Sequence, residues 1–221
     1  MTSPSDEAAR LAIQPPEVGG EELSPANVGM LSVQKGDTLE GLLLERVELQ
    51  DTELRQISWR RCAFEHCSLQ QLQARRSNFT DVVFRGCDLS NADLRDCVFH
   101  RVRFEGCRLT GANLSLSGLH EVLFVDCTAH YASLMECKLS GLLFERCRLS
   151  DTSLYRSGGK RYGFTGCTLT GIDFRGLKLA GLDLSDNEIE AASWGEPELK
   201  GALVSPLQAC DIARLWGVTV L

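Results

Sequence analysis

The chain of 221 residues has no long apolar run, and its first twenty residues lack the apolar core of a secretory signal. Its longest apolar stretches are only a few residues, whereas a membrane-spanning helix needs about 20. Asp6 and Glu7 stand where a signal peptide would carry basic residues before an apolar segment. We therefore expect a cytoplasmic protein without a membrane span.

Signatures of catalysis and of metal binding are also missing. The ten cysteines form no compact CxxC pair of the kind that holds zinc, and no nucleophile–base constellation is recognisable. The segment from Ser157 to Arg161 reads SGGKR, which lacks the spacing of a phosphate-binding P-loop. His100 and His120 are predicted to share an exposed side. We expect no enzyme, no metal and no cofactor.

What the chain does contain is a five-residue repeat over residues 38–190, without a gap. Residues 86–115 read GCDLS, NADLR, DCVFH, RVRFE, GCRLT and GANLS. A large apolar residue occupies the centre of each unit, position i, and a small or apolar residue lies at i−2. Of 31 consecutive centres, only Ala74, Ala129 and Gly159 are not large and apolar. This pattern must be explained before any other.

A period of five fits neither a helix nor a strand, but a chain that bends by about a quarter turn per unit closes a square every 20 residues. Phenylalanine recurs at that interval from Phe64 to Phe164, and cysteine from Cys67 to Cys167. Such columns predict ladders of identical side chains inside a four-sided solenoid. Nine of the ten cysteines fall at the inward position i−2, so we expect reduced thiols in the core.

Three units read Ala92-Asp93-Leu94, Ala112-Asn113-Leu114 and Ile172-Asp173-Phe174. This pattern resembles the pentapeptide-repeat family. The resemblance implies an all-β, right-handed quadrilateral β-helix of nearly eight coils. With coils about 4.8 Å apart, the rod would be roughly 37 Å long. Relatives that confer quinolone resistance mimic DNA and bind type II topoisomerases, so the resemblance also implies such a partner and a homodimer formed through the C-terminal end.

The remaining segments divide the chain. We expect a disordered N-terminus over residues 1–8, an N-terminal cap over 9–37 with short strands near 11–13 and 30–33, the β-helix over 38–190, and a cap helix and tail over 191–221. Ser205 and Gln208 would form the capping box of that helix. The expected cap and dimer residues are Ile212, Leu215, Trp216, Val218, Val220 and Leu221.

Charge is unevenly spread. The net charge is −7, yet residues 40–189 hold 20 acidic and 19 basic residues, so most of the surplus lies outside the rod. One side gathers bases: Arg60, Arg61, Arg101, Lys138, Lys160, Arg161 and Lys178. Another gathers acids beside an apolar patch of Leu123, Val125 and Leu143, which we expect to be exposed, and such a patch is a usual signal of a partner site. The candidate partner-binding residues on that side are Glu65, Glu105, Leu123, Val125, Asp126, Leu143, Glu145, Asp183 and Asp186.

Two functions remain open. The first is a DNA mimic that binds DNA gyrase or topoisomerase IV and modulates it or protects it from antibiotics. The second is a protein–protein interaction scaffold that docks a partner through the patch around Leu123 and Leu143. Direct nucleic-acid binding by the basic side is not favoured, because the chain is acidic overall and carries no recognised nucleic-acid motif.

Overall fold

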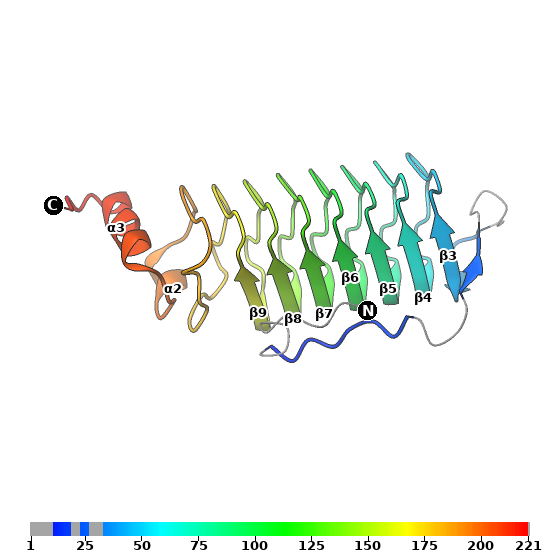
Figure 1. The fold of residues 1–221 in the computed structure, drawn as a ribbon, viewed down its shortest axis with the longest axis horizontal. Coiled ribbons are helices and arrows are strands. Elements are labelled where there is room, and N and C mark those ends of the chain that lie inside the picture. The colour runs from blue at the N-terminus through cyan, green and yellow to red at the C-terminus, as the bar shows by residue number, and fades with distance from the viewer. Residues whose placement is uncertain (1–10, 19–22, 27–32, 221) are drawn as a thin grey trace.

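The computed structural model describes residues 11–18, 23–26 and 33–220, and these form an elongated rod of stacked coils (Figure 1). In strands β2 to β9 and in the isolated bridges of the rod, residues pair in parallel with the residue 20 positions on. Phe64 lies opposite Phe84, and Phe84 lies opposite Phe104. The prediction of a right-handed, four-sided β-helix is confirmed.

One strand per coil covers two adjacent sides of the rod, and isolated parallel bridges join the coils on the other two. The strands form a single sheet in the order β1-β3-β4-β5-β6-β7-β8-β9, with β2 beside β4. Their bounds are β1 Ser24–Pro25, β2 Thr38–Glu40, β3 Leu42–Glu45, β4 Ser58–Glu65, β5 Asn78–Arg85, β6 Val98–Glu105, β7 Gly118–Val125, β8 Lys138–Glu145 and β9 Gly158–Thr165.

The corners of each coil lie at position i+2, where the backbone is left-handed. The φ angle is 54° at His66, 51° at Arg101 and 53° at Asp126. Residues other than glycine adopt this conformation rarely, at a cost of roughly 1 kcal/mol each. Backbone hydrogen bonds between coils and the inward packing of position i offset that cost, so the corners accept charged, polar and small residues, although none of them is β-branched.

Aromatic rings fill one column of the core. The rings of Phe64, Phe84, Phe104, Phe124, Phe144 and Phe164 stack nearly parallel, with neighbouring centroids 4.6–5.6 Å apart. The predicted ladder is confirmed. Apolar burial of this kind is the main favourable contribution to folding.

The nine inward cysteines are buried free thiols, as expected. Their Sγ atoms donate to backbone carbonyls, as from Cys87 to Phe64 O at 3.3 Å. In another column serine does the same, as from Ser117 Oγ to Leu94 O at 3.0 Å. Burial raises the pKa of Cys97 to about 12, so that thiol stays protonated at neutral pH. Small polar side chains thus satisfy backbone groups inside the rod.

The rod continues beyond residue 190, where the expected boundary is wrong. Parallel bridges join Asp173 to Ser193 and Asp183 to Leu203, and the ring of Trp194 stacks on a phenylalanine one coil earlier, with centroids 5.9 Å apart. The short helix α2 (Glu196–Leu199) replaces one side of the last coil. The five-residue spacing of inward residues continues to Trp194, whose ring fills the interior of the rod as the earlier centres do.

Helix α3 (Pro206–Leu215) begins at the predicted capping box. Ser205 Oγ accepts from the backbone N–H of Gln208, and Gln208 Oε1 accepts from the N–H of Ser205. The side-chain amide of Gln208 also donates to the carbonyls of Leu184 and Asn187, at 2.8 and 2.7 Å. One glutamine therefore fastens α3 to the open end of the coils. No helix among residues 11–18, 23–26 and 33–220 is long and apolar enough to cross a membrane.

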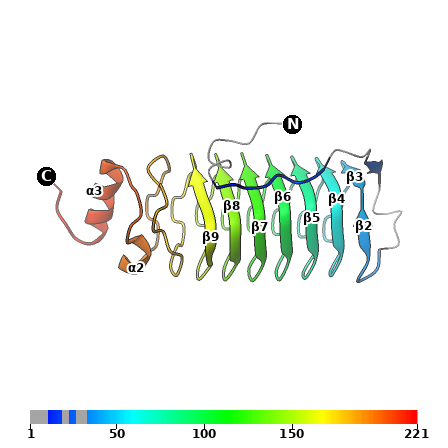
Figure 2. The ribbon, with the colours of Figure 1, turned by 90° about the horizontal axis from the view of Figure 1, so that it is seen from below.

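The N-terminal segment departs from the expected cap. Residues 23–26 do cover the first coil, since β1 pairs with β3. Residues 11–18, called the strap from here on, instead run along the side of the rod across β9 to β5 (Figures 1 and 2). No strand forms at 11–13, because the strap contacts side chains rather than a strand edge. Residues 1–8 and 30–32 lie outside the described residues.

Candidate binding surfaces

The predicted acidic side is largely neutralised by ladders of ion pairs. Arg85 lies between Glu65 and Glu105 of the neighbouring coils, with N–O distances of 2.7 and 3.1 Å. Arg146 pairs with Asp126 through two contacts of 2.8 and 3.0 Å. Because these pairs repeat along the rod, the middle of this side presents alternating charge rather than a continuous negative strip.

The apolar patch on that side is covered by the strap. Leu123, Val125 and Leu143 are buried in one cluster with Ile13, and Leu11 packs against it. The expectation that the three rod residues are exposed is wrong, because the strap supplies apolar side chains that cover them. Their role in partner binding stays a prediction.

Polar contacts hold the first half of the strap to two neighbouring side chains. Arg161 Nη1 donates to the carbonyls of Leu11 and Ala12, at 3.2 and 3.1 Å. The N–H of Gln14 donates to Glu121 Oε2 at 3.1 Å, and Arg161 and Glu121 are ion-paired with each other. A guanidinium thus binds strap carbonyls while a carboxylate binds a strap amide.

The second half of the strap is held at Asp81, whose carboxylate is buried. Its Oδ1 accepts from the N–H of Glu17 at 2.9 Å, and both its oxygens accept from Arg101 at 2.6 and 2.5 Å. Burial acts to raise the pKa of Asp81, but the hydrogen bonds from Arg101 and Glu17 and the charges of Arg101 and His100 outweigh it, so the pKa is lowered. The carboxylate is therefore held ionised under the strap.

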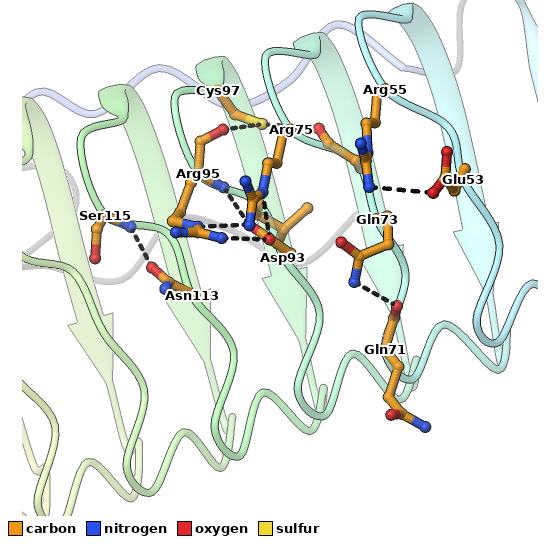
Figure 3. A network of polar contacts seen from close by, with 12 residues as sticks. Glu53, Arg55, Gln71, Gln73, Arg75, Asp93, Arg95, Cys97, Asn113 and Ser115 are labelled. Atoms are coloured by element: carbon orange, nitrogen blue, oxygen red, sulfur yellow. Dashed lines mark hydrogen bonds and ion pairs between the residues drawn. The ribbon is translucent and has the colours of Figure 1, made fainter.

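Arginines on a further side are also held by carboxylates (Figure 3). Asp93 accepts from Arg75 of the preceding coil and from Arg95, whose Nη2 lies 2.8 Å from Asp93 Oδ2. Arg55 pairs with Glu53 at 3.1 Å. This side therefore also has little net charge.

Ion pairing also reduces the net positive charge of the predicted basic side. Arg101 and Arg161 contact acids as described, and a guanidinium nitrogen of Arg61 lies 2.8 Å from a carboxylate oxygen of Glu40. His100 and His120 are partners in neighbouring strands, as predicted. Within the part of the chain that the structure describes, no group of three or more His, Cys, Asp or Glu residues could hold a metal ion.

Within the rod as the structure describes it, from residue 38 onward, acidic residues without nearby bases are concentrated near the C-terminal end. Residues 40–180 carry 17 acids and 19 bases, whereas residues 181–199 carry six acids and no lysine or arginine. Neutral donors hold two of the acids: Gly166 N–H to Asp186 at 3.1 Å, and Thr168 Oγ1 to Glu188 at 3.0 Å. This acidic belt consists of Asp183, Asp186, Glu188, Glu190, Glu196 and Glu198.

The end of the rod beside the belt is apolar. Among the described residues, five of the eight large apolar side chains that are exposed lie here: Leu203, Leu207, Leu215, Trp216 and Val218. A cleft of about 430 Å³ separates α3 from the last coil. Of the predicted cap residues, Ile212 packs on the core and Val220 is half-buried. Leu221 lies outside the described residues.

A rod of stacked coils, in which each coil contacts only its neighbours, belongs to the class of solenoids. A family described as pentapeptide repeat region matches residues 97–174, and one described as pentapeptide repeats matches residues 77–115. Residues 77–174 therefore carry pentapeptide repeats, and the resemblance to that family is confirmed.

Several solved structures are similar to this chain. A trypsin-treated form of QnrB1, a plasmid-mediated fluoroquinolone resistance protein, is 17% identical over 85% of this chain and 98% of its own, with a TM-score of 0.41. HetL, from the cyanobacterium Nostoc, is 18% identical over 77% and 90%, with a TM-score of 0.25. A protein of the Arabidopsis thaliana thylakoid lumen is 21% identical over 72% and 77%, with a TM-score of 0.19. No curated protein matches.

Proposed function

We propose that this protein is a non-enzymatic binding protein that mimics duplex DNA toward a cytoplasmic type II topoisomerase, DNA gyrase or topoisomerase IV. By occupying the DNA site it would modulate the enzyme or protect it from antibiotics that act on the enzyme–DNA complex. The family resemblance motivates the class of partner. The acidic belt is the observation that carries the proposal.

Charge density favours the belt, rather than the middle of the rod, as the surface that mimics DNA. Duplex DNA carries one negative charge per about 1.7 Å of its axis, so one coil of about 4.8 Å corresponds to roughly three charges. Residues 181–199 supply six acids and no base, whereas residues 40–180 are close to neutral. Of the acids selected from sequence, Asp183 and Asp186 belong to the belt, while Glu65, Glu105 and Asp126 are compensated by arginine.

The apolar end supports a homodimer. The exposed Leu215, Trp216 and Val218 form an apolar surface that a second copy of the same surface would bury. Two copies joined end to end would place their acidic belts on either side of the junction. The dimer would then carry a negative centre about two belts long, which one protomer alone does not have.

A supercoiling assay with purified gyrase tests the proposal. Wild-type protein should inhibit supercoiling at low micromolar concentration and relieve cleavage induced by a topoisomerase poison. The triple variant Asp186→Asn/Glu188→Gln/Glu190→Gln should need at least about tenfold more protein, because it removes charges that would replace phosphates.

The matched control is Glu65→Gln/Glu105→Gln/Asp126→Asn, which removes three acids already paired with arginine. It should stay within about twofold of wild type, because its sites lie three or more coils from Asp186, at least about 14 Å along the rod, beyond the Debye length of about 8 Å at physiological ionic strength. Equal effects of the two triple variants, or no effect of wild type on gyrase and topoisomerase IV, would contradict the proposal and favour an interaction scaffold with another partner.

A further inference from the structure

We propose that the groove beneath the strap is a docking site for an extended segment of a partner protein, and that the strap is its resident competitor. The groove consists of Leu123, Val125 and Leu143 with the flanking Asp81, Glu121 and Arg161. The proposal is independent of the acidic belt and of the identity of the topoisomerase.

The polar groups of the groove recognise main chain. Arg161 binds two strap carbonyls, and Glu121 and Asp81 each bind one strap N–H group. None of these four contacts involves a strap side chain. The contacts follow the path of the main chain, which turns at Leu11–Ala12, where the φ of Ala12 is 50°, and then continues without regular secondary structure. A site that binds backbone groups along such a path tolerates many sequences, as in other modes of peptide recognition.

The groove selects one side chain of the segment that binds in it. Ile13 is the only buried residue of the strap, at 8% exposure, and it packs on Leu123, Val125 and Leu143. The pattern that fits the groove is therefore an extended segment with one branched apolar residue. Prolines two and three positions after that residue, as in the strap, hold the segment extended before binding.

The rod is shaped to admit this contact. Arg161 and Glu121 lie two coils apart, and the corner between them is Gly141, with φ of 87°. A Cβ atom there would lie 2.7 Å from Glu121 Oε2. The missing side chain lets the guanidinium and the carboxylate meet over the intervening coil, where together they bind consecutive parts of the strap.

The strap is suited to displacement. Its described contacts are four hydrogen bonds to its main chain, the buried side chain of Ile13 and the partly buried side chain of Leu11, and it belongs to no strand. Its tether to the rod raises its effective concentration, so a partner segment must bind more tightly or arrive at high local concentration. The uncovered patch is then available only when such a partner is present.

The test uses full-length protein and a fluorescein-labelled peptide of residues 11–18, followed by fluorescence anisotropy. Ile13→Asp should release the strap and bind the peptide at least about tenfold more tightly than wild type, in which the groove is occupied. The matched control, Gln14→Ser, changes an exposed neighbour without adding a charge beside Glu121, keeps the main-chain N–H, and should behave as wild type. Adding Arg161→Ala or Leu123→Asp to Ile13→Asp should weaken binding by about tenfold or more.

A second peptide, with serine at positions 12, 14 and 17, tests backbone recognition and should bind within about threefold of the native peptide. A peptide carrying Ile13→Asp should not bind. Circular dichroism establishes that each variant is folded, and Ile13→Gly replaces Ile13→Asp if the latter is not. Failure of strap-released protein to bind either peptide, or binding of the native peptide alone, would overturn the proposal, whatever the result with gyrase.

Discussion

Truncating one ring in the middle of the phenylalanine ladder should destabilise the whole rod. Phe104 is fully buried, and its ring lies between those of Phe84 and Phe124, at centroid distances of 4.8 and 4.6 Å and interplanar angles of 4° and 3°. Phe104→Ala removes both stacked pairs and leaves a cavity that neighbouring coils cannot close, because their backbone ladders fix the spacing.

The expected loss is about 3–5 kcal/mol in the free energy of unfolding, as for other aromatic truncations in cores. Each lost aromatic pair contributes about 0.5–1.5 kcal/mol beyond buried area, so the upper half of that range applies here. In a solenoid each coil contacts only its neighbours, and a weakened central interface should also broaden the transition. Urea unfolding followed by circular dichroism measures both effects.

The control is His100→Ala in the same strand, whose side chain is half-buried on the outside of the rod. It should change the free energy of unfolding by less than about 0.5 kcal/mol, as for surface substitutions. A loss below about 1 kcal/mol for Phe104→Ala, or equal losses for both variants, would refute the reasoning that the ladder carries the stability.

Three further predictions follow from single sites. Gly159→Ala should cost about 3 kcal/mol or more in urea unfolding, because a Cβ atom would lie 1.8 Å from Leu139 O. Because the pKa of Asp81 is lowered, its carboxylate stabilises the strap at any pH above its ordinary pKa of about 3.9, and this stabilisation is lost as the pH falls further. Proteolysis of the strap by pepsin should therefore rise below about pH 4. Arg101→Ala should move the pH at which this rise begins upward. Trp216→Asp should shift the mass in light scattering to that of a monomer, and an unchanged dimer mass would show that the interface lies elsewhere.

The fold was predictable because every coil of a solenoid repeats the same pattern of inward and outward residues. The columns from Phe64 to Phe164 and from Cys67 to Cys167 assign inward positions directly, since only a 20-residue coil stacks them. The left-handed corners were predictable in part, because nine of the 31 corner positions are glycine and none is β-branched. Residues as different as His66 and Asp126 occupy other corners and obscure that signal. At those corners backbone pairing between coils, rather than residue type, fixes the conformation.

The end of the rod could have been placed better. Trp194, Leu199 and Val204 continue the five-residue spacing of the centres, and all three pack on the core. This continuation of the repeat was hard to recognise because the helix α2 replaces one side of the coil. The acidic belt was likewise visible in the sequence, but only when charge is counted coil by coil instead of along a side.

The strap could not be predicted from the repeat. It lies outside the five-residue pattern, and its partners Asp81, Glu121 and Arg161 are 64 to 150 positions away along the chain. The apolar patch was recognised in the sequence, but it was expected to be exposed, and its role in partner binding stays a prediction. What the pattern could not reveal is that the first partner is the chain itself.

The most direct test of the acidic belt is the salt dependence of binding to purified gyrase. The dissociation constant of wild-type protein should rise steeply between about 50 and 200 mM salt, as for duplex DNA. In Asp186→Asn/Glu188→Gln/Glu190→Gln the slope should fall markedly, while the variant that removes the arginine-paired acids should keep it. A wild-type affinity that does not change with salt, or a slope that the belt variant leaves intact, would contradict DNA mimicry by this surface.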